Sequence, residues 1–368
     1  MKRLGKSCHA CSAAVGIVVL ILVFASHGLA GTTPKFIYTA NYYSNDVSAY
    51  AVNSSTGALT MVNGSPFMAG MNPFSLTVDP SGKFLYVLNY ISNNISAYTI
   101  NGSTGALTPI SGSPFAAGEN PISVVIDPAG KFAYVANYHS DNVMGYAINS
   151  SSGALTPMSG SPFATGSHPA TMAMTVSGKF VYVGNYNSNN VSAFSVNKST
   201  GVLTPVKGGP VAAGTNPVSV AVDPAGKFLF ATNYTSTNIS VYTINETTGA
   251  LTQAGGSPYP ALRFPFGVTV DPAGKFAYVA NYGATNVSAY AIGSTGALTQ
   301  IQGSPFRSGS APMVVTLDPS GKFAYTANAG SSNISAYTVN SATGMLTQVK
   351  GSPYSPDAVP FSVAVAAQ

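Results

Sequence analysis

The chain has 368 residues, of which 45% are hydrophobic and 7% are charged, and it contains 38 Gly, 25 Pro, 21 Tyr and no Trp. This composition excludes a disordered chain, because disorder needs high charge and few aromatic residues. Three of the 15 Lys and Arg lie in the first six residues, so the remainder is close to neutral against its 10 Asp and Glu. Without a basic tract, we expect no nucleic-acid partner.

Residues 1–30 have the pattern of a signal peptide. A cationic start precedes an apolar run over residues 13–24, and small residues follow at Gly28 and Ala30. We therefore expect cleavage and export to the periplasm, the cell surface or the medium. The alternative is an uncleaved membrane anchor, but the run is shorter than the roughly 20 residues that span a bilayer. Both cysteines lie in this leader, so we expect no disulfide or thiolate site in the mature chain.

After the leader, one sequence unit recurs seven times. The string Gly-Lys-Phe-x-Tyr-Val-x-Asn-Tyr recurs at intervals of 48 residues, with a last interval of 47. Its lysines are Lys35, Lys83, Lys131, Lys179, Lys227, Lys275 and Lys322. The unit also carries the strings Asn-Val/Ile-Ser-Ala-Tyr, Thr-Gly-Ala-Leu-Thr, Gly-Ser-Pro-Phe and Asn-Pro-x-Ser-Val-x-x-Asp-Pro. A fixed period of this length indicates a repeat architecture.

Each unit predicts four short strands, which in the third unit are residues 122–127, 132–137, 143–148 and 154–158. These segments are rich in Val, Tyr, Phe and Thr and are bounded by Gly, Pro, Asn and Ser. The string from Asp127 to Gly130 predicts a tight turn in which the aspartate caps the backbone, which argues against a calcium site. The repeats therefore predict an all-β, seven-bladed β-propeller with four antiparallel strands per blade.

The two ends of the repeat region complement each other. Residues 36–41 are a second-strand sequence and residues 361–366 are a first-strand sequence, so one blade must combine both ends. We expect a single domain over residues 31–368, with the ring closed by the C-terminal strand joining the N-terminal blade. The alternative, an open solenoid, would need atypical capping repeats at its ends.

The repeated strings resemble a known group of proteins. Tyr-Val-Ala-Asn at residues 134–137 looks like the Tyr-Val-Thr-Asn repeat of β-propellers. The longer unit is similar to the lactonase family of seven-bladed propellers, which includes the bacterial 6-phosphogluconolactonase type and the fungal carboxymuconate cycloisomerases. The resemblance covers residues 35–366 and implies a metal-independent hydrolase with a His, Glu and Arg set at the channel mouth. Those residues have no match by string here, because the shared strings belong to the scaffold.

Titratable residues that occur in one repeat only are the candidates for a site. Because strands alternate in direction, the loops before the first strands and the turns after the second strands share one face, which borders the channel mouth. Eight such residues lie on that face, namely Asp46, Glu119, His139, Asp141, His168, Arg263, Arg307 and Asp357. We predict Glu119, His168 and Arg263 as catalytic residues and His139 and Arg307 as substrate-binding residues.

Two functions are compatible with this set. Hydrolysis of a small lactone would use Glu119 or His168 to activate water and Arg263 to hold the oxyanion. Few cations lie near the mouth, which favours a neutral or monocarboxylate lactone over a phosphorylated one. In the alternative, a non-catalytic surface or envelope propeller binds a sugar-like ligand or a cell-surface partner. The site residues also have a purely structural alternative, in which Glu119 and His168 are solvated loop residues and Arg263 stacks on Phe264 or Phe266. We expect a monomer without metal or cofactor, and the recurrent tyrosines are expected to pack the blades rather than to bind sugars.

Overall fold

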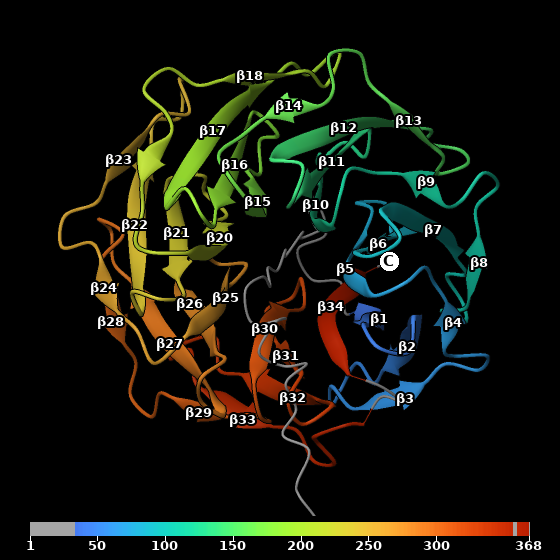
Figure 1. The fold of residues 1–368 in the computed structure, drawn as a ribbon. Helices are drawn as coiled ribbons and strands as arrows, with labels where there is room; N and C mark the ends of the chain where they lie inside the picture. Colours follow the sequence, from blue (N-terminus) through green and yellow to red (C-terminus); the bar gives the residue numbers. More distant parts are fainter. Residues whose placement is uncertain (1–33, 356–358, 368) are drawn as a thin grey trace, which may run out of the picture.

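The computed structural model describes residues 34–355 and 359–367, and these ranges contain β-strands and no helix. The strands form seven sheets arranged radially around a central axis (Figure 1). The predicted all-β, seven-bladed propeller is thereby confirmed. The predicted leader lies outside the described residues. Within the described ranges no helix could span a membrane.

Each blade has an inner, a second, a third and an outer strand, and the blades are numbered I to VII from the N-terminus. The inner strands are β34 (Pro360–Ala367), β5 (Pro73–Val78), β10 (Pro121–Ile126), β15 (Pro169–Met174), β20 (Pro217–Val222), β25 (Pro265–Val270) and β30 (Pro312–Leu317). The second strands are β1 (Pro34–Asn41), β6 (Phe84–Asn89), β11 (Phe132–Asn137), β16 (Phe180–Asn185), β21 (Phe228–Asn233), β26 (Phe276–Asn281) and β31 (Phe323–Asn328).

The third and outer strands follow the same order of blades. The third strands are β2 (Asp46–Val52), β7 (Asn94–Ile100), β12 (Asn142–Ile148), β17 (Asn190–Val196), β22 (Asn238–Ile244), β27 (Asn286–Ile292) and β32 (Asn333–Val339). The outer strands are β3 (Leu59–Met61), β8 (Leu107–Pro109), β13 (Leu155–Pro157), β18 (Leu203–Pro205), β23 (Leu251–Gln253), β28 (Leu298–Gln300) and β33 (Leu346–Gln348).

The outer edge of six blades carries a further two-residue strand that the sequence analysis did not predict. These strands are β4 (Phe67–Met68), β9 (Phe115–Ala116), β14 (Phe163–Ala164), β19 (Val211–Ala212), β24 (Tyr259–Pro260) and β29 (Phe306–Arg307). In blade III, β13 and β14 pair with opposite ends of β12. Between them, the Ser161 hydroxyl accepts the backbone N–H of Gly145 at 3.0 Å. The Gly-Ser-Pro-Phe string therefore divides the outer strand and supplies one hydrogen bond where the strand is interrupted.

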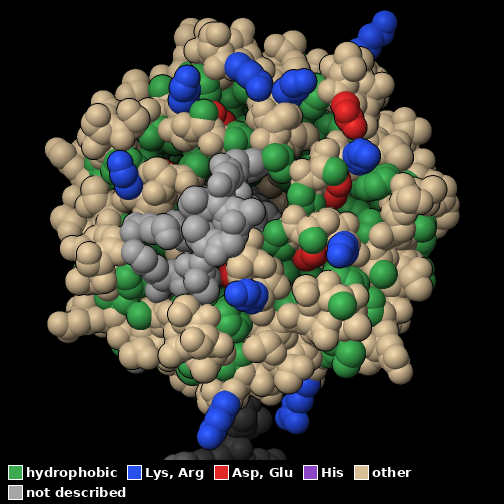
Figure 2. Space-filling model, turned by 180° about the vertical axis from the view of Figure 1, so that it is seen from behind, with side chains coloured by type: hydrophobic (Ala, Val, Ile, Leu, Met, Phe, Trp, Pro, Cys, Tyr) green, Lys and Arg blue, Asp and Glu red, His purple; other side chains and the backbone are tan. Residues whose placement is uncertain are grey.

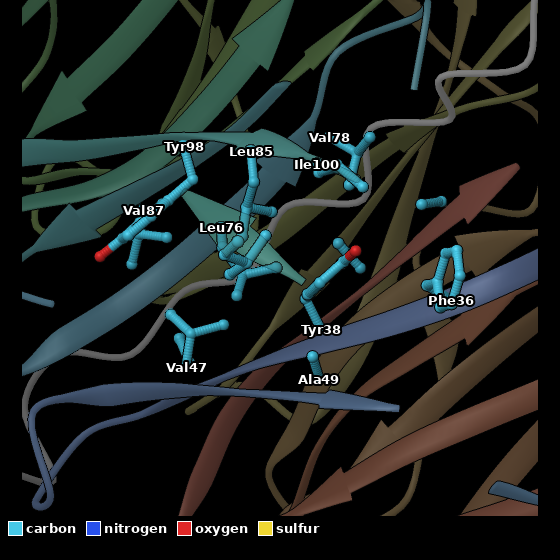
Figure 3. Packing of buried hydrophobic residues seen from close by; sticks show 14 of the residues in the cluster. Phe36, Tyr38, Val47, Ala49, Leu76, Val78, Leu85, Val87, Tyr98 and Ile100 are labelled. Carbon is cyan, nitrogen blue, oxygen red and sulfur yellow. The ribbon is translucent and has the colours of Figure 1, made fainter. Parts of the chain in front are cut away.

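Neighbouring blades pack face to face through apolar clusters. Between blades I and II, Tyr38 and Val47 from one sheet meet Leu76 and Leu85 from the next (Figure 3). The hydroxyl of Tyr38 also donates to the carbonyl of Gly105 at 2.9 Å. The same bond recurs between Tyr86 and Gly153, Tyr134 and Gly201, Tyr182 and Gly249, Tyr278 and Gly344, and Tyr325 and Gly57.

Two constraints require glycine at the position that accepts the tyrosine hydroxyl, such as Gly105. Gly105 has a φ of 76°, a conformation that side chains with a Cβ rarely adopt. A Cβ there would also overlap the ring of Phe36 from the preceding blade. The Thr-Gly-Ala-Leu-Thr string is thus explained by the docking of one blade on the next.

The turns between the inner and second strands use their aspartates as predicted. Asp127 Oδ1 accepts the backbone N–H groups of Lys131 and Phe132, each at 2.6 Å. These carboxylates are therefore occupied locally, and no group of three or more potential metal ligands occurs among the described residues. Viewed from behind Figure 1, the ring carries Lys and Arg side chains spread around its circumference rather than gathered in one patch (Figure 2).

The ring closes within blade I as predicted. Strand β34 pairs antiparallel with β1, with Ile37 opposite Val365 and Thr39 opposite Val363. On its other side, β1 pairs with β2. The sheet of blade I thus joins the two ends of the repeat region, which lie beside each other in Figure 1.

Removal of residues 360–368 should destabilise the whole ring. The truncated chain would expose the inner edge of β1 and would lose the apolar contacts that Val363 and Ala364 make with the adjacent blades. We expect a lower melting temperature in circular dichroism and a tendency to aggregate. A truncated protein that melts at the temperature of the full chain and stays monomeric would contradict the closure.

Candidate functional site

The mouth of the channel is bordered by two sets of loops that are bonded to each other. The turn between the second and third strands of a blade has a residue with positive φ, whose side chain accepts a backbone N–H from the loop that begins the next blade. The pairs are Asn45 with Asn72, Asn93 with Asn120, Asp141 with His168, and Asn189 with Asn216, at 2.7 to 2.8 Å. The predicted sharing of one face by these loops is confirmed.

A ring of tyrosines, here called the tyrosine collar, surrounds the mouth. It consists of the residues that directly follow the second strands, namely Tyr42, Tyr90, Tyr138, Tyr186, Tyr234 and Tyr282, with Ala329 in the seventh blade. They pack in one apolar cluster with residues near the start of the inner strands, such as Phe74 and Ile122. The expectation that these tyrosines pack the blades is confirmed.

Burial keeps the phenols of the collar neutral. Burial raises the pKa of Tyr90 to about 12, and the neighbouring Tyr42 adds to the shift. Burial likewise raises the pKa of Tyr234 to about 12, with Tyr282 and Tyr186 contributing. Ring centroids of Tyr42 and Tyr90 lie 6.5 Å apart, so adjacent phenols are close enough to oppose each other's ionisation.

Two of the predicted site residues, His139 and His168, come together on one side of the collar. Their ring centroids are 5.4 Å apart, and each ring packs edge-on against Tyr138, at 5.1 Å for His139 and 4.3 Å for His168. His139 follows β11 in blade III, whereas His168 precedes β15 in blade IV. The pair therefore bridges two neighbouring blades.

The hydrogen bonds of His139 assign its neutral tautomer. Its Nδ1 contacts Oδ1 of Asn120, and the Nδ2 of the same amide donates to the carbonyl of Tyr90 at 2.9 Å. Since the amide nitrogen is committed to a carbonyl, Asn120 must present oxygen to the ring, and His139 must donate Nδ1–H to it. The Nε2 atom of neutral His139 then carries a lone pair, as a general base requires.

His168 has the opposite set of neighbours. Its Nδ1 lies 2.9 Å from Nδ2 of Asn187 and 2.8 Å from the hydroxyl of Ser167, and both can donate to it. An accepting Nδ1 leaves Nε2–H as the donor in the neutral ring. The two histidines are thus arranged as one acceptor and one donor.

The surroundings of His168 also keep it neutral. Burial lowers the pKa of His168, and His139 lowers it further, whereas the carboxylate of Asp141 acts in the opposite direction. Asp141 Oδ1 stands 4.0 Å from the ring Nδ1 and accepts the backbone N–H of His168. The backbone bond fixes the loop, and the negative charge limits the fall in pKa.

Glu119 lies beside this pair. Its carbonyl accepts the backbone N–H of His139 at 3.3 Å, and its own N–H donates to the hydroxyl of Ser140 at 2.8 Å. The side chain is exposed, and no hydrogen bond or ion pair joins its carboxylate to another residue in the described ranges. The carboxylate is available to a ligand at the mouth.

The predicted arginines lie elsewhere on the ring. Arg263 begins blade VI, which is separated from blade III by blades IV and V, and its guanidinium lies 4.9 Å from the ring centre of Phe264. Phe264 in turn stacks on Tyr234, with centroids 4.7 Å apart. Arg307 lies in β29 at the outer edge of blade VI, opposite Asn286 of β27.

Of the remaining acidic residues in the predicted set, Asp46 also lies away from the histidine pair. Asp46 is buried, and its Oδ1 accepts from Asn41 at 2.7 Å, the contact made by the repeat asparagine in other blades. Asp357 lies outside the described residues. The structure therefore brings Glu119, His139, Asp141 and His168 together, and it places Asp46, Arg263 and Arg307 elsewhere on the ring.

Two contributing residues, Asn120 and Asn187, were missed by the sequence reasoning, and Tyr138 was expected only to pack the blades. All three belong to strings that recur, and a comparison limited to charged residues that occur once passes over them. The sequence did contain a signal for these asparagines. His139 and Asn187 occupy the same repeat position in neighbouring blades, and Asn120 and His168 share another repeat position. Comparing the seven blades position by position would have found the group.

A family model described as "Lactonase, 7-bladed beta-propeller" matches residues 31–125, 113–213, 161–262 and 260–364. No match was found among curated proteins. Among solved structures, a candidate 6-phosphogluconolactonase from Bacteroides uniformis is 20% identical with a TM-score of 0.78, covering 90% of this chain and 98% of that one. The periplasmic gluconolactonase PpgL from Pseudomonas aeruginosa is 17% identical with a TM-score of 0.77, covering 90% and 99%.

A protein that is not named as a lactonase has a similar fold. Hydrazine synthase from Kuenenia stuttgartiensis is 19% identical with a TM-score of 0.61, covering 86% of this chain and 99% of that one. At these identities a structural likeness speaks for the fold alone. The family model, in contrast, matches nearly the whole of the repeat region. The chain belongs to the family of seven-bladed β-propeller lactonases.

Proposed function

We propose that the protein hydrolyses a small lactone at the mouth of the channel, on the side of blades III and IV. The observation that carries this proposal is the contact of His139 and His168, 5.4 Å apart, with the Nδ1 of His139 bound to Asn120. Membership of the lactonase family makes ring opening the first reaction to test.

In the proposed reaction, His139 Nε2 takes a proton from water as the water oxygen attacks the lactone carbonyl carbon. The negative charge that develops on the carbonyl oxygen is stabilised by a neutral donor, for which His168 Nε2–H is the adjacent group. Collapse of the tetrahedral intermediate breaks the bond between the acyl carbon and the ring oxygen. Protonated His139 returns its proton to that oxygen, and the product is a hydroxy acid.

The remaining polar residues fit the recognition of a polyol or a carboxylate. The exposed carboxylate of Glu119 can accept hydrogen bonds from substrate hydroxyls, and the collar phenols can donate. Arg263, three blades away, can bind a carboxylate at the far side of the mouth. A phosphate group would call for several cations, so we infer an unphosphorylated lactone as the substrate.

The leader sequence completes the proposal. With a signal peptide over residues 1–30 and cleavage after it, hydrolysis would take place outside the cytoplasm, by a monomer that needs no metal or cofactor. Export also removes the protein from cytosolic sugar phosphates, in agreement with an unphosphorylated substrate.

A second candidate function is binding without hydrolysis. The tyrosine collar favours it, because aromatic rings beside hydroxyl groups suit a sugar-like ligand, including one on a cell surface. The two candidates differ in one respect that can be measured, since only the first requires His139 as a base.

Replacing the proposed base should abolish turnover and leave the fold intact. For His139→Gln we expect kcat on glucono-1,5-lactone to fall by roughly 10²–10⁴-fold. Melting should be little changed, since the side chain is exposed and blades IV and V carry Asn187 and Thr235 at this position. The unaltered protein should hydrolyse this lactone faster than its 6-phosphate.

Thr235→Gln is the matched control. Thr235 contacts the side chain of Asn216 in blade V, as His139 contacts that of Asn120 in blade III. The Thr235→Gln variant should keep the lactonase activity of the unaltered protein. Equal activity of His139→Gln and the unaltered protein would refute the role of His139. A complete absence of lactone hydrolysis, with retained binding of the lactone, would favour the second candidate.

The pKa of His168 should respond to its two charged neighbours in opposite directions. Asp141→Asn removes the carboxylate and should lower the pKa further, while its Oδ1 can still cap the loop, as Asn93 does in blade II. His139→Gln should raise it, because the repulsion between the rings disappears. Titration of the imidazole signals by NMR measures both shifts.

The lowered pKa of His168 determines how its contribution to the free energy of unfolding changes with pH. The neutral ring is favoured in the folded state, so the contribution of His168 is present above its unfolded pKa of 6.5 and is lost as the pH falls through the folded value. A pKa of His168 above 6.5, or no change in Asp141→Asn, would contradict the assigned environment.

A further inference from the structure

The mouth face over blades I and II carries large apolar side chains that are exposed to solvent. The exposed fraction is 57% for Tyr43, 73% for Met68, 55% for Met71 and 47% for Ile91. These four residues, here called the apolar sector, are half of the eight large hydrophobic side chains that are exposed in the described ranges. Such side chains gathered on one face usually mark a binding surface.

The fold does not require large apolar residues at these positions. At the position of Ile91, the blades from III onward carry His139, Asn187, Thr235, Gly283 and Gly330. At the position of Met71, blades III to VII carry Glu119, Ser167, Thr215, Arg263 and Ser310. At the position of Met68, the later blades carry Ala116, Ala164, Ala212, Pro260 and Arg307. The apolar sector is therefore a departure from the repeat, like the histidine pair.

Hydrogen bonds connect the apolar sector to the proposed site without interruption. The Nδ2 of Asn72 donates to the carbonyl of Tyr42 at 3.1 Å, which joins the Met71 loop to the Tyr43 turn. The N–H of Ile91 donates to the carbonyl of Met71 at 3.3 Å. The next loop along the ring contains Glu119 and is bonded to His139 in the same way.

The order of the blades around the ring determines which side chains a molecule bound along the mouth would contact. Blades I, II and III are consecutive, so the face changes from the apolar sector to Glu119 and then to the histidine pair (Figure 1). A molecule that lies along this arc would have one apolar end and one polar, reactive end. A purely polar sugar lactone would leave the apolar side chains unused.

We propose that the substrate is a lactone with an aliphatic substituent of several carbons, whose ring lies at His139 and His168 and whose chain lies on Met71 and Ile91. This inference rests on the proposed lactonase function and adds the class of substrate to it. The chain gains affinity because it covers apolar side chains that are otherwise exposed to water. Each fully buried methylene gives roughly a fourfold gain in affinity, and partial cover by a pentyl chain should give about tenfold.

A pair of substrates with the same ring tests the chain site. The value of kcat/KM should be about tenfold higher for δ-decalactone, which carries a pentyl chain, than for unsubstituted δ-valerolactone. The double variant Met71→Ser, Ile91→Ser should lower the ratio of the two values toward one. An equal kcat/KM for both lactones, or a double variant that keeps the preference, would overturn the proposal.

Met345→Ser is the matched control. Met345 is 40% exposed and precedes β33 at the outer edge of blade VII, in a turn on the face opposite the mouth. Its replacement should leave both rates unchanged. Sedimentation should show that the unaltered protein and all variants are monomers. If the unaltered protein were a dimer and the double variant a monomer, the apolar sector would be an interface between copies of this chain, and the proposal would be overturned.

Binding measurements separate this inference from the proposed function. The δ-lactams of the same two rings resist hydrolysis, and calorimetry gives their Kd values. If no lactone is hydrolysed, the lactonase proposal fails, yet tighter binding of the pentyl lactam that disappears in the double variant would still establish the chain site. Equal Kd values for the two lactams would refute the chain site, whatever the activity.

Discussion

The joint between neighbouring blades is the interaction on which the ring depends. In it, a buried tyrosine hydroxyl such as that of Tyr86 donates to a glycine carbonyl one blade on, and the glycine has room only for hydrogen beside a phenylalanine ring. One such hydrogen bond contributes about 1 kcal/mol, but the bond occurs at six of the seven joints, each beside an apolar cluster. The last of them, from Tyr325 to Gly57, joins blade VII to blade I across the closure.

This repeated joint leaves the mouth face free to vary. The collar tyrosines and the capping bonds between turn and loop hold the backbone at the mouth, so a side chain at the position of Asn120 or His139 can change without loss of the ring. Blade IV places His168 where blade III has Asn120, and blade VI places Phe264 there. The titratable group on blades III and IV and the apolar sector on blades I and II are two results of the same freedom.

The strands and the closure of the ring could be predicted from the sequence, because the repeated strings determine them. The grouping of the site side chains could not, because it depends on where each side chain points. The strand predicted at residues 132–137 is β11, and closure by the last strand follows from the order of strings alone. The divided outer strand escaped prediction because its second part is two residues long. Arg263 was expected near Glu119 because both lie in loops on the mouth face, but blades IV and V separate them, and Arg263 lies over Phe264, the arrangement foreseen as the alternative.

The proton positions on the histidine pair are the most direct test of the proposed chemistry. In protein labelled with ¹⁵N on histidine, the shifts of Nδ1 and Nε2 report the neutral tautomer of each ring. The account predicts Nδ1–H for His139, with an unprotonated Nε2, and Nε2–H for His168. A neutral His139 that carries its proton on Nε2 would have no lone pair there to activate water, and that result would contradict the assignment of His139 as the base.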